Sequence, residues 1–363
     1  MSDSLAAEKG NPMRFFSAVL TLMSLALAFG GSEALGRQGQ GSEPHNFLST
    51  VAGFTEVELG AMDQGSVIVK AVRTEVDSEV ALVGAALFRT STEFFLTMYE
   101  DIERFESPLG PLKKVSDPPR AEDFSSLSLP DKDIDALANC RVGDCDLKLG
   151  EDGITRFQTE IDWTSQQARP QAQSLVRELA LDFLTAYQEG GNQTLGIRRD
   201  NKKPTLVQEQ FEALLEDSDY LVTYVPDLHR YLRDYPKAEL PGATDFLYWA
   251  VNDFGLEPVL RLSHVTIYRT GGDPNSSAVI ASKQLYLSRY FYTGLDLRFL
   301  VRNQSDPGDE SFYLVTISRF RSDELGGLFG GVVRKAAESG ARDGLQRYLE
   351  VSKPAIESYF RDR

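Results

Sequence analysis

The chain has 363 residues, and its 54 Asp and Glu residues against 38 Lys and Arg residues give a formal net charge of -16 at pH 7. A surface this acidic repels phosphate backbones, so the composition argues against a nucleic-acid partner. Hydrophobic residues make up 42% of the chain and aromatic residues 10%, which is enough for a packed core and too much for a disordered chain.

The N-terminal segment has the pattern of a secretory signal. Lys9 and Arg14 precede the apolar run FFSAVLTLMSLALAF, residues 15–29. This run is shorter than the roughly 20 residues of a membrane-spanning helix, and small residues follow it where a signal peptidase cuts. We therefore expect residues 1–34 to be a cleaved signal peptide, which leaves an exported protein, periplasmic or extracellular, with no transmembrane segment. A retained N-terminal anchor helix is the alternative, and Met13 is an alternative start.

The only two cysteines, Cys140 and Cys145, have four residues between them. A CxxC redox pair has a different spacing, and the three histidines are too scattered to complete a four-ligand metal site. In an exported chain a short local disulfide is the favoured interpretation. Closing so short a loop would stabilise the fold by about 2 kcal/mol on the chain-entropy model.

Past the signal, residues 35–46 are rich in Gly, Gln, Ser and Glu and are predicted to be a disordered leader before a single domain at 47–363. Residues 66–73 and 79–89 are rich in Val and Ala, with a polar TEVDS step between them, which predicts a β-hairpin. The segment EFFLTMYEDIERF then carries apolar residues at helical spacing after a Thr-Ser-Thr N-cap candidate.

The middle of the chain, about 106–245, is predicted to be a large and mostly helical insertion. Apolar residues fall on one face of a long amphipathic helix over residues 165–189. Shorter helices are predicted at 205–216 and at 226–234, the second with proline at its first position.

The C-terminal third changes to a period of two. It predicts four antiparallel strands, at residues 258–269, 278–291, 294–302 and 311–321, joined by turn-rich links. A long helix follows, with small residues such as Ala336, Gly340 and Gly344 along one face, which we expect to lie close to the sheet. The predicted fold class is α+β: an antiparallel sheet gripped by a long C-terminal helix, with a large, mostly helical insertion.

This order of elements resembles the START-like, or SRPBCC, helix-grip superfamily of lipid-transfer and polyketide-cyclase domains. The resemblance lies in residues 66–104, which match the opening hairpin and helix, and in residues 258–360, which match the closing strands and helix. It implies an apolar tunnel between the sheet and the terminal helix, and hence a hydrophobic small molecule or lipid as partner.

Aromatic side chains with polar tips suit the wall of such a cavity, and a few polar residues would orient the ligand. We expect the wall to include Tyr268, Tyr286, Tyr290 and Phe299. The candidates for contact with a polar or anionic head group are His264, Lys283 and Arg319. The alternative for the strand cations is that they point outward and pair with carboxylates.

The leading hypothesis is an exported binding or carrier protein for a hydrophobic or amphipathic small molecule. One alternative is a cyclase- or hydrolase-like enzyme that uses His264 as general acid or base. Another is an envelope scaffold in which the acidic helical region 106–245 is a docking surface. The sequence has no GxSxG, HExxH or Walker motif, so we expect no metal and no cofactor.

Overall fold

The structure is a computed structural model that describes residues 43–106, 110–252, 257–270, 277–303, 310–322, 325 and 330–362. The expected signal peptide, residues 1–34, and most of the expected leader lie outside the described residues. The first helix, α1 (Glu43–Thr50), begins within the end of that leader. The described residues belong to one unit, Gly41–Arg363.

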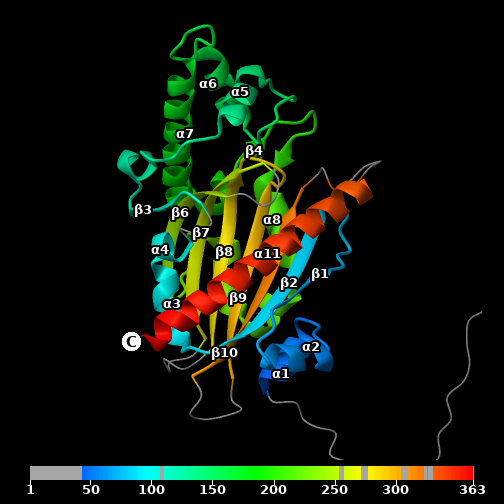
Figure 1. The fold of residues 1–363 in the computed structure, drawn as a ribbon. Coiled ribbons are helices and arrows are strands. Elements are labelled where there is room, and N and C mark those ends of the chain that lie inside the picture. Colours follow the sequence, from blue (N-terminus) through cyan, green and yellow to red (C-terminus); the bar gives the residue numbers. More distant parts are fainter. Residues whose placement is uncertain are drawn as a thin grey trace, which may run out of the picture. The chain divides into compact units, whose positions relative to one another are not determined.

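An antiparallel sheet of eight strands forms the centre of this unit, in the order β1-β2-β10-β9-β8-β7-β6-β3 (Figure 1). β1 and β3 lie at its two edges. Because both strands are short, they leave few backbone N–H and C=O groups unpaired at the edges. The strands are β1 (Ile68–Val72), β2 (Glu79–Phe88), β3 (Leu112–Val115), β6 (Thr244–Asn252), β7 (Val259–Arg269), β8 (Ala278–Leu287), β9 (Thr293–Arg302) and β10 (Phe312–Arg321).

The predicted α+β class, with its opening hairpin and its four-stranded meander, is confirmed. Period-two alternation and turn-rich links located β7 to β10 to within a few residues, because both signals are local. One irregularity was not predicted: the pairing of β7 with β8 shifts between Leu262 and Ser263. This bulge lets Leu262 pair with Tyr286 and Ser263 pair with Gln284, so Leu285 is the extra residue of β8.

One face of the sheet is covered by α3 (Thr92–Glu100), α4 (Ile102–Glu106) and the long α11 (Gly330–Arg361), which crosses the strands obliquely (Figure 1). Ser91 begins α3 by accepting a hydrogen bond from the backbone N–H of Phe94 at 3.2 Å. α11 packs against β2 and β1. At Gly84 of β2 an added Cβ would lie 3.0 Å from Leu345 and 3.2 Å from Leu349, so here the helix lies close to the sheet. The predicted packing of the terminal helix on the sheet is confirmed.

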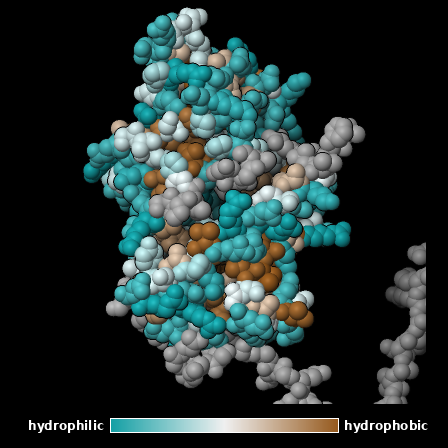
Figure 2. All heavy atoms as spheres, viewed as in Figure 1, coloured by the Kyte–Doolittle hydropathy of each residue, from teal (hydrophilic) through white to brown (hydrophobic). Residues whose placement is uncertain are grey.

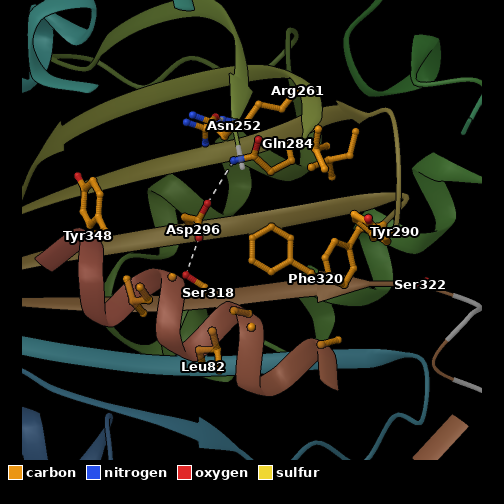
Figure 3. A pocket seen from close by; sticks show the side chains of 18 of the residues that line it. Leu82, Asn252, Arg261, Gln284, Tyr290, Asp296, Ser318, Phe320, Ser322 and Tyr348 are labelled. Carbon is orange, nitrogen blue, oxygen red and sulfur yellow. Dashed lines mark hydrogen bonds between the residues drawn. The ribbon is translucent and has the colours of Figure 1, made fainter. Parts of the chain in front are cut away.

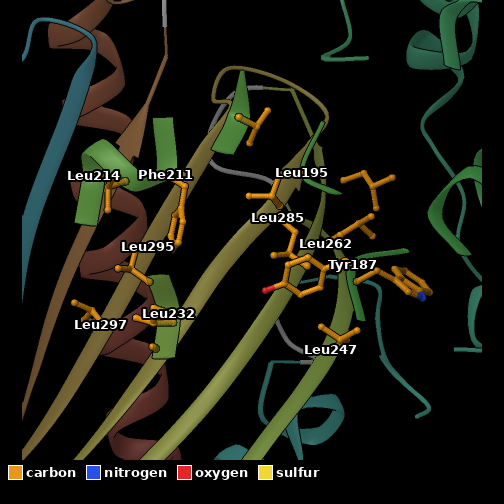
Figure 4. Close-up of a cluster of buried hydrophobic side chains, with 14 of the residues drawn as sticks. Tyr187, Leu195, Phe211, Leu214, Leu232, Leu247, Leu262, Leu285, Leu295 and Leu297 are labelled. Atoms are coloured by element: carbon orange, nitrogen blue, oxygen red, sulfur yellow. The ribbon is translucent and has the colours of Figure 1, made fainter. Parts of the chain in front are cut away.

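The opposite face is covered by helices of the insertion. α7 (Ala168–Gly190), α8 (Val207–Glu216) and α10 (Pro226–Asp234) place Tyr187, Phe211 and Leu232 over the strands (Figure 4). They pack on leucines of four neighbouring strands, Leu247, Leu262, Leu285, Leu295 and Leu297. α1 and α2 (Glu56–Asp63) add Leu48 and Leu59 to the same core. Both faces of the central strands are therefore buried.

The rest of the insertion is built from short elements. These are the helices α5 (Asp131–Asn139), α6 (Glu151–Thr159) and α9 (Asp219–Tyr224), the 3-10 turns η2 (Ala121–Phe124) and η3 (Gly191–Thr194), and the hairpin of β4 (Ile197–Arg198) with β5 (Thr205–Leu206). Cys140 and Cys145 are joined, with Sγ–Sγ 1.93 Å, which confirms the predicted disulfide. In the described part of the chain, every helix is too short or too polar to cross a membrane.

Two strands of the sheet were missed in the sequence. β6, with the sequence TDFLYWAVN, lacks the alternation of apolar and polar residues because both of its faces are buried. Leu247 and Trp249 belong to the core on one face, and Tyr248 and Ala250 to the core on the other. β3 has only four residues and pairs with β6 across more than 130 residues of chain. A local pattern holds no information on so distant a partner.

Candidate functional site

A cavity of about 490 Å³ lies between α11 and the sheet. On the helix side its wall is made mostly of small residues, Ala336, Ala337, Gly340, Ala341 and Gly344, followed by the larger Leu345 and Tyr348. A Cβ added at Gly344 would meet no atom within 4 Å. From the sequence we expect the face of small residues to bring α11 close to the sheet. The structure shows this close packing along only part of the helix. α11 touches the sheet near Gly84 and stands off it over the cavity.

Most of the cavity wall is apolar. Figure 3 shows Phe320 and Tyr290 toward one end and Tyr348 at the other. The remaining apolar wall comes from β2, β7, β8 and the segments after β8 and β10, with Leu82, Val259, Leu287, Phe291 and Leu325. Figure 2 shows this face of the molecule as mostly hydrophilic, with hydrophobic side chains gathered in patches alongside α11.

A row of polar side chains forms the floor of the cavity on the sheet. Asp296 of β9 accepts hydrogen bonds from Ser318 Oγ at 2.5 Å and from Gln284 Nε2 at 3.2 Å (Figure 3). Gln284 in turn accepts a hydrogen bond from Ser263 Oγ at 2.7 Å. Neutral donors from two strands, β8 and β10, thus hold the Asp296 carboxylate in place.

A buried ion pair closes one side of this floor. Arg261 Nη2 of β7 lies 2.5 Å from Glu106 Oε2 at the end of α4, and Arg261 Nε donates to Asn252 Oδ1 at 2.7 Å. Glu106 is 1% exposed and Arg261 is 8% exposed. Burial disfavours the charged guanidinium, but Tyr248 and Glu106 outweigh it and raise the pKa of Arg261. Glu106 and Arg261 are therefore each other's charged partner.

Arg298 of β9 lines the cavity and is 7% exposed. Its guanidinium lies 5.4 Å from the ring centre of Tyr99 on α3 and 5.6 Å from that of Tyr348 on α11. Within the described chain, Arg298 Nε and Nη1 have no hydrogen-bond partner. Burial disfavours its charge, yet Tyr99, Tyr348 and Asp296 hold the pKa of Arg298 well above its ordinary value, so it remains a cation.

Of the seven ligand-contact residues expected from the sequence, the structure places only Tyr290 in this cavity. Tyr290 has a positive φ of 66°, and its hydroxyl accepts a hydrogen bond from the Glu257 backbone N–H at 3.0 Å. The other six lie on the opposite face of the sheet, under the helices of the insertion. They are His264, Tyr268, Lys283, Tyr286, Phe299 and Arg319.

The two expected cations on that face already have partners. Arg319 lies 2.5 Å from Glu79, which is fully buried, and also donates to the Ser218 hydroxyl. Lys283 Nζ donates to Asn192 Oδ1 and lies 4.0 Å from the ring centre of Phe211. Burial lowers the pKa of Lys283 well below its ordinary value. The expectation that these cations line the space under the terminal helix is not met.

His264 lies beside a separate, polar hollow of about 500 Å³. Tyr187 Oη is 2.9 Å from its Nδ1, and Asp245 Oδ1 is 3.0 Å from its Nε2. Burial would raise the pKa of Asp245, but hydrogen bonds from His264, Thr266 and Tyr231 outweigh it and lower that pKa. Both ring nitrogens of His264 are engaged, so the residue links α7 to β6.

The polar residues of the cavity were missed in the sequence, although they left a signal there. Four successive strands carry polar pairs two residues apart on the face toward α11: Arg261 with Ser263, Ser282 with Gln284, Asp296 with Arg298, and Thr316 with Ser318. Strand charges usually point to solvent, which is why they were read as outward. A polar face that continues over several central strands, followed by a helix of small residues, indicates a buried cavity instead.

Comparison with known proteins adds no further assignment: no protein-family model, no curated protein and no solved structure matches this chain.

Proposed function

We propose that the protein binds and carries a hydrophobic or amphipathic small molecule in the cavity between α11 and the sheet. The observation that carries this proposal is the partly open cavity of about 490 Å³ with mostly apolar walls. Protein interiors contain few voids larger than a water molecule, whereas ligand pockets measure roughly 300–1,000 Å³. A space of this size, kept open by the small residues of α11, is suited to a ligand.

The energetics favour an apolar ligand. Each 100 Å² of apolar ligand surface removed from water contributes about 2.5 kcal/mol, before the loss of ligand freedom is subtracted. The polar floor around Asp296 and Arg298 would orient one end of the molecule. Apolar affinity combined with a single polar region is what a carrier of amphipathic molecules requires.

The resemblance to START-like helix-grip domains supports the same function. The elements that carry it, an opening hairpin, a following helix, an antiparallel meander and a terminal helix across the sheet, are all part of the fold. The disulfide between Cys140 and Cys145 supports work outside the cytosol, where such bonds persist. We place the carrier in the periplasm or the extracellular space.

The test is the binding of an apolar fluorescent probe, N-phenyl-1-naphthylamine, to the delipidated full chain. The wild type is expected to bind one probe per chain, and Gly344→Leu is expected to bind it more weakly because its side chain takes up part of the cavity. Gly331→Leu is the matched control, since Gly331 is also in α11 with open space around it and does not line the cavity. Equal binding by the two variants would contradict the proposal.

A further inference from the structure

Polar groups without partners gather around one residue of the cavity. Within the described chain, Arg298 Nε and Nη1, Tyr99 Oη, Tyr348 Oη and Thr316 Oγ1 are all buried and have no hydrogen-bond partner. Thr316 is the residue directly across from Arg298 in the pairing of β10 with β9. Tyr99 and Tyr348 flank the guanidinium from α3 and α11. Four elements thus converge on a site that is rich in donors.

Such a cluster is unusual, because about nine in ten buried polar groups in native proteins have a partner. The nearby carboxylates do not supply one directly. Glu106 is engaged by Arg261, and Asp296 is engaged by Ser318 and Gln284. The charge of Arg298 is thus balanced only at a distance, and within the described chain no acceptor takes the N–H groups of its Nε and Nη1 atoms.

From this geometry we infer that Arg298 binds the carboxylate of an amphipathic acid whose hydrocarbon tail fills the apolar part of the cavity. This inference rests on the proposed carrier function and names its ligand class. The Nε and Nη1 atoms of Arg298 carry three N–H donors, and a carboxylate offers about four acceptor positions where a neutral carbonyl offers two. A hydrogen bond from a guanidinium N–H to a carboxylate is also charge-assisted and roughly twice as strong as one between neutral groups.

The shape of the cavity fixes the direction of the molecule. Tyr348 lies at one end of it, and Phe320 and Tyr290 lie toward the other (Figure 3). A head group at Arg298 therefore sends its tail past Phe320 toward Leu325 and Phe291. Asp296 and Glu106 face the same space and repel an anion, so selectivity depends on direct contact with Arg298.

The experiment compares dodecanoate with dodecanol, which share a tail and differ in charge, by isothermal titration calorimetry at pH 8 on the delipidated full chain. The wild type is expected to bind dodecanoate at least tenfold more tightly than dodecanol. Arg298→Gln is expected to weaken dodecanoate binding at least tenfold and to leave dodecanol binding within twofold. Tyr348→Phe, which removes only a hydroxyl, is expected to weaken dodecanoate binding a few-fold and guards against a folding defect in the first variant.

The outcomes separate this inference from the proposed function. If the wild type binds both ligands equally, or Arg298→Gln binds dodecanoate as the wild type does, the carboxylate assignment is overturned and the carrier function stands. If the wild type binds neither ligand and N-phenyl-1-naphthylamine does not bind either, both are overturned.

Discussion

Filling the cavity from α11 gives the sharpest prediction on stability. In Gly344→Leu the new side chain enters open space, because a Cβ at this position meets no atom within 4 Å and Gly344 lines the cavity. A leucine side chain occupies on the order of 100 Å³, which at about 24 cal/mol per Å³ of cavity corresponds to roughly 2 kcal/mol. Replacing a helical glycine adds about 0.5–1 kcal/mol. We expect the ligand-free variant to be more stable by about 3 kcal/mol.

The assay is urea unfolding of the delipidated protein, followed by circular dichroism, with the free energy of unfolding extrapolated to water. Gly331→Leu is the control: Gly331 is the second residue of α11 and does not line the cavity, so the variant gains at most the helix term of about 0.5–1 kcal/mol. A gain for Gly344→Leu that does not exceed the control would refute the reasoning, since it would mean that the space under α11 is not open. A loss of stability would refute it as well, because it would mean that the side chain collides with the sheet.

Three further predictions concern the ion pair beside the cavity, the hydrogen bonds of Asp245 on the opposite face of the sheet, and the disulfide of the insertion. Glu106→Gln leaves Arg261 buried without its carboxylate and should lower the free energy of unfolding by about 3–5 kcal/mol. The double variant Glu106→Gln/Arg261→Met should recover part of this loss. A loss below about 1 kcal/mol in urea unfolding would argue against the ion pair. Asp245 has a lowered pKa in the folded state, so its contribution is present above the unfolded-state pKa and is lost as pH falls through the folded-state value. Wild type should therefore exceed Asp245→Asn in stability at pH 7 and lose this advantage toward pH 3, and an advantage that persists at acid pH would count against the hydrogen bonds to His264, Thr266 and Tyr231. Replacing Cys140 and Cys145 by alanine should lower the free energy of unfolding by about 2 kcal/mol, since the closed loop is short; an unchanged denaturation midpoint would show that the bond is dispensable.

The sequence predicted the sheet and the terminal helix well because both depend on local periodicity. Strands β7 to β10 alternate over ten or eleven residues and are separated by turn-rich links, so their existence and order could be predicted. Leu260, Leu262, His264 and Tyr268 alternate along β7 and all lie on the side of the insertion helices, as the period of a strand requires.

The sequence did not show which face of the sheet lies under α11 and which lies under the helices of the insertion. The insertion at 106–245 covers one side of the sheet and α11 covers the other, so both sides of each central strand are buried. The alternation of side chains along a strand shows which residues share a face. It does not show which helix covers that face. From the sequence we expect the strand face with Tyr268, Tyr286 and Phe299 to line the cavity. In the structure this face packs in the core under α7, α8 and α10.

Two features of the site depend on contacts that no local pattern encodes. The bulge in β8 moves Leu287 to the cavity side and leaves Tyr286 packed against the opposite core. The pair of Glu106 and Arg261 joins residues 155 positions apart in the chain. Both depend on three-dimensional register, which sequence spacing alone does not specify.

The most direct test of the carrier function is native mass spectrometry of the full chain as purified, before and after extraction with organic solvent. We predict a mass above that of the chain by one small molecule, which is lost on extraction and is reduced in occupancy in Gly344→Leu. A wild-type protein that always has the mass of the bare chain, and that takes up neither dodecanoate nor dodecanol when they are added, would contradict the account.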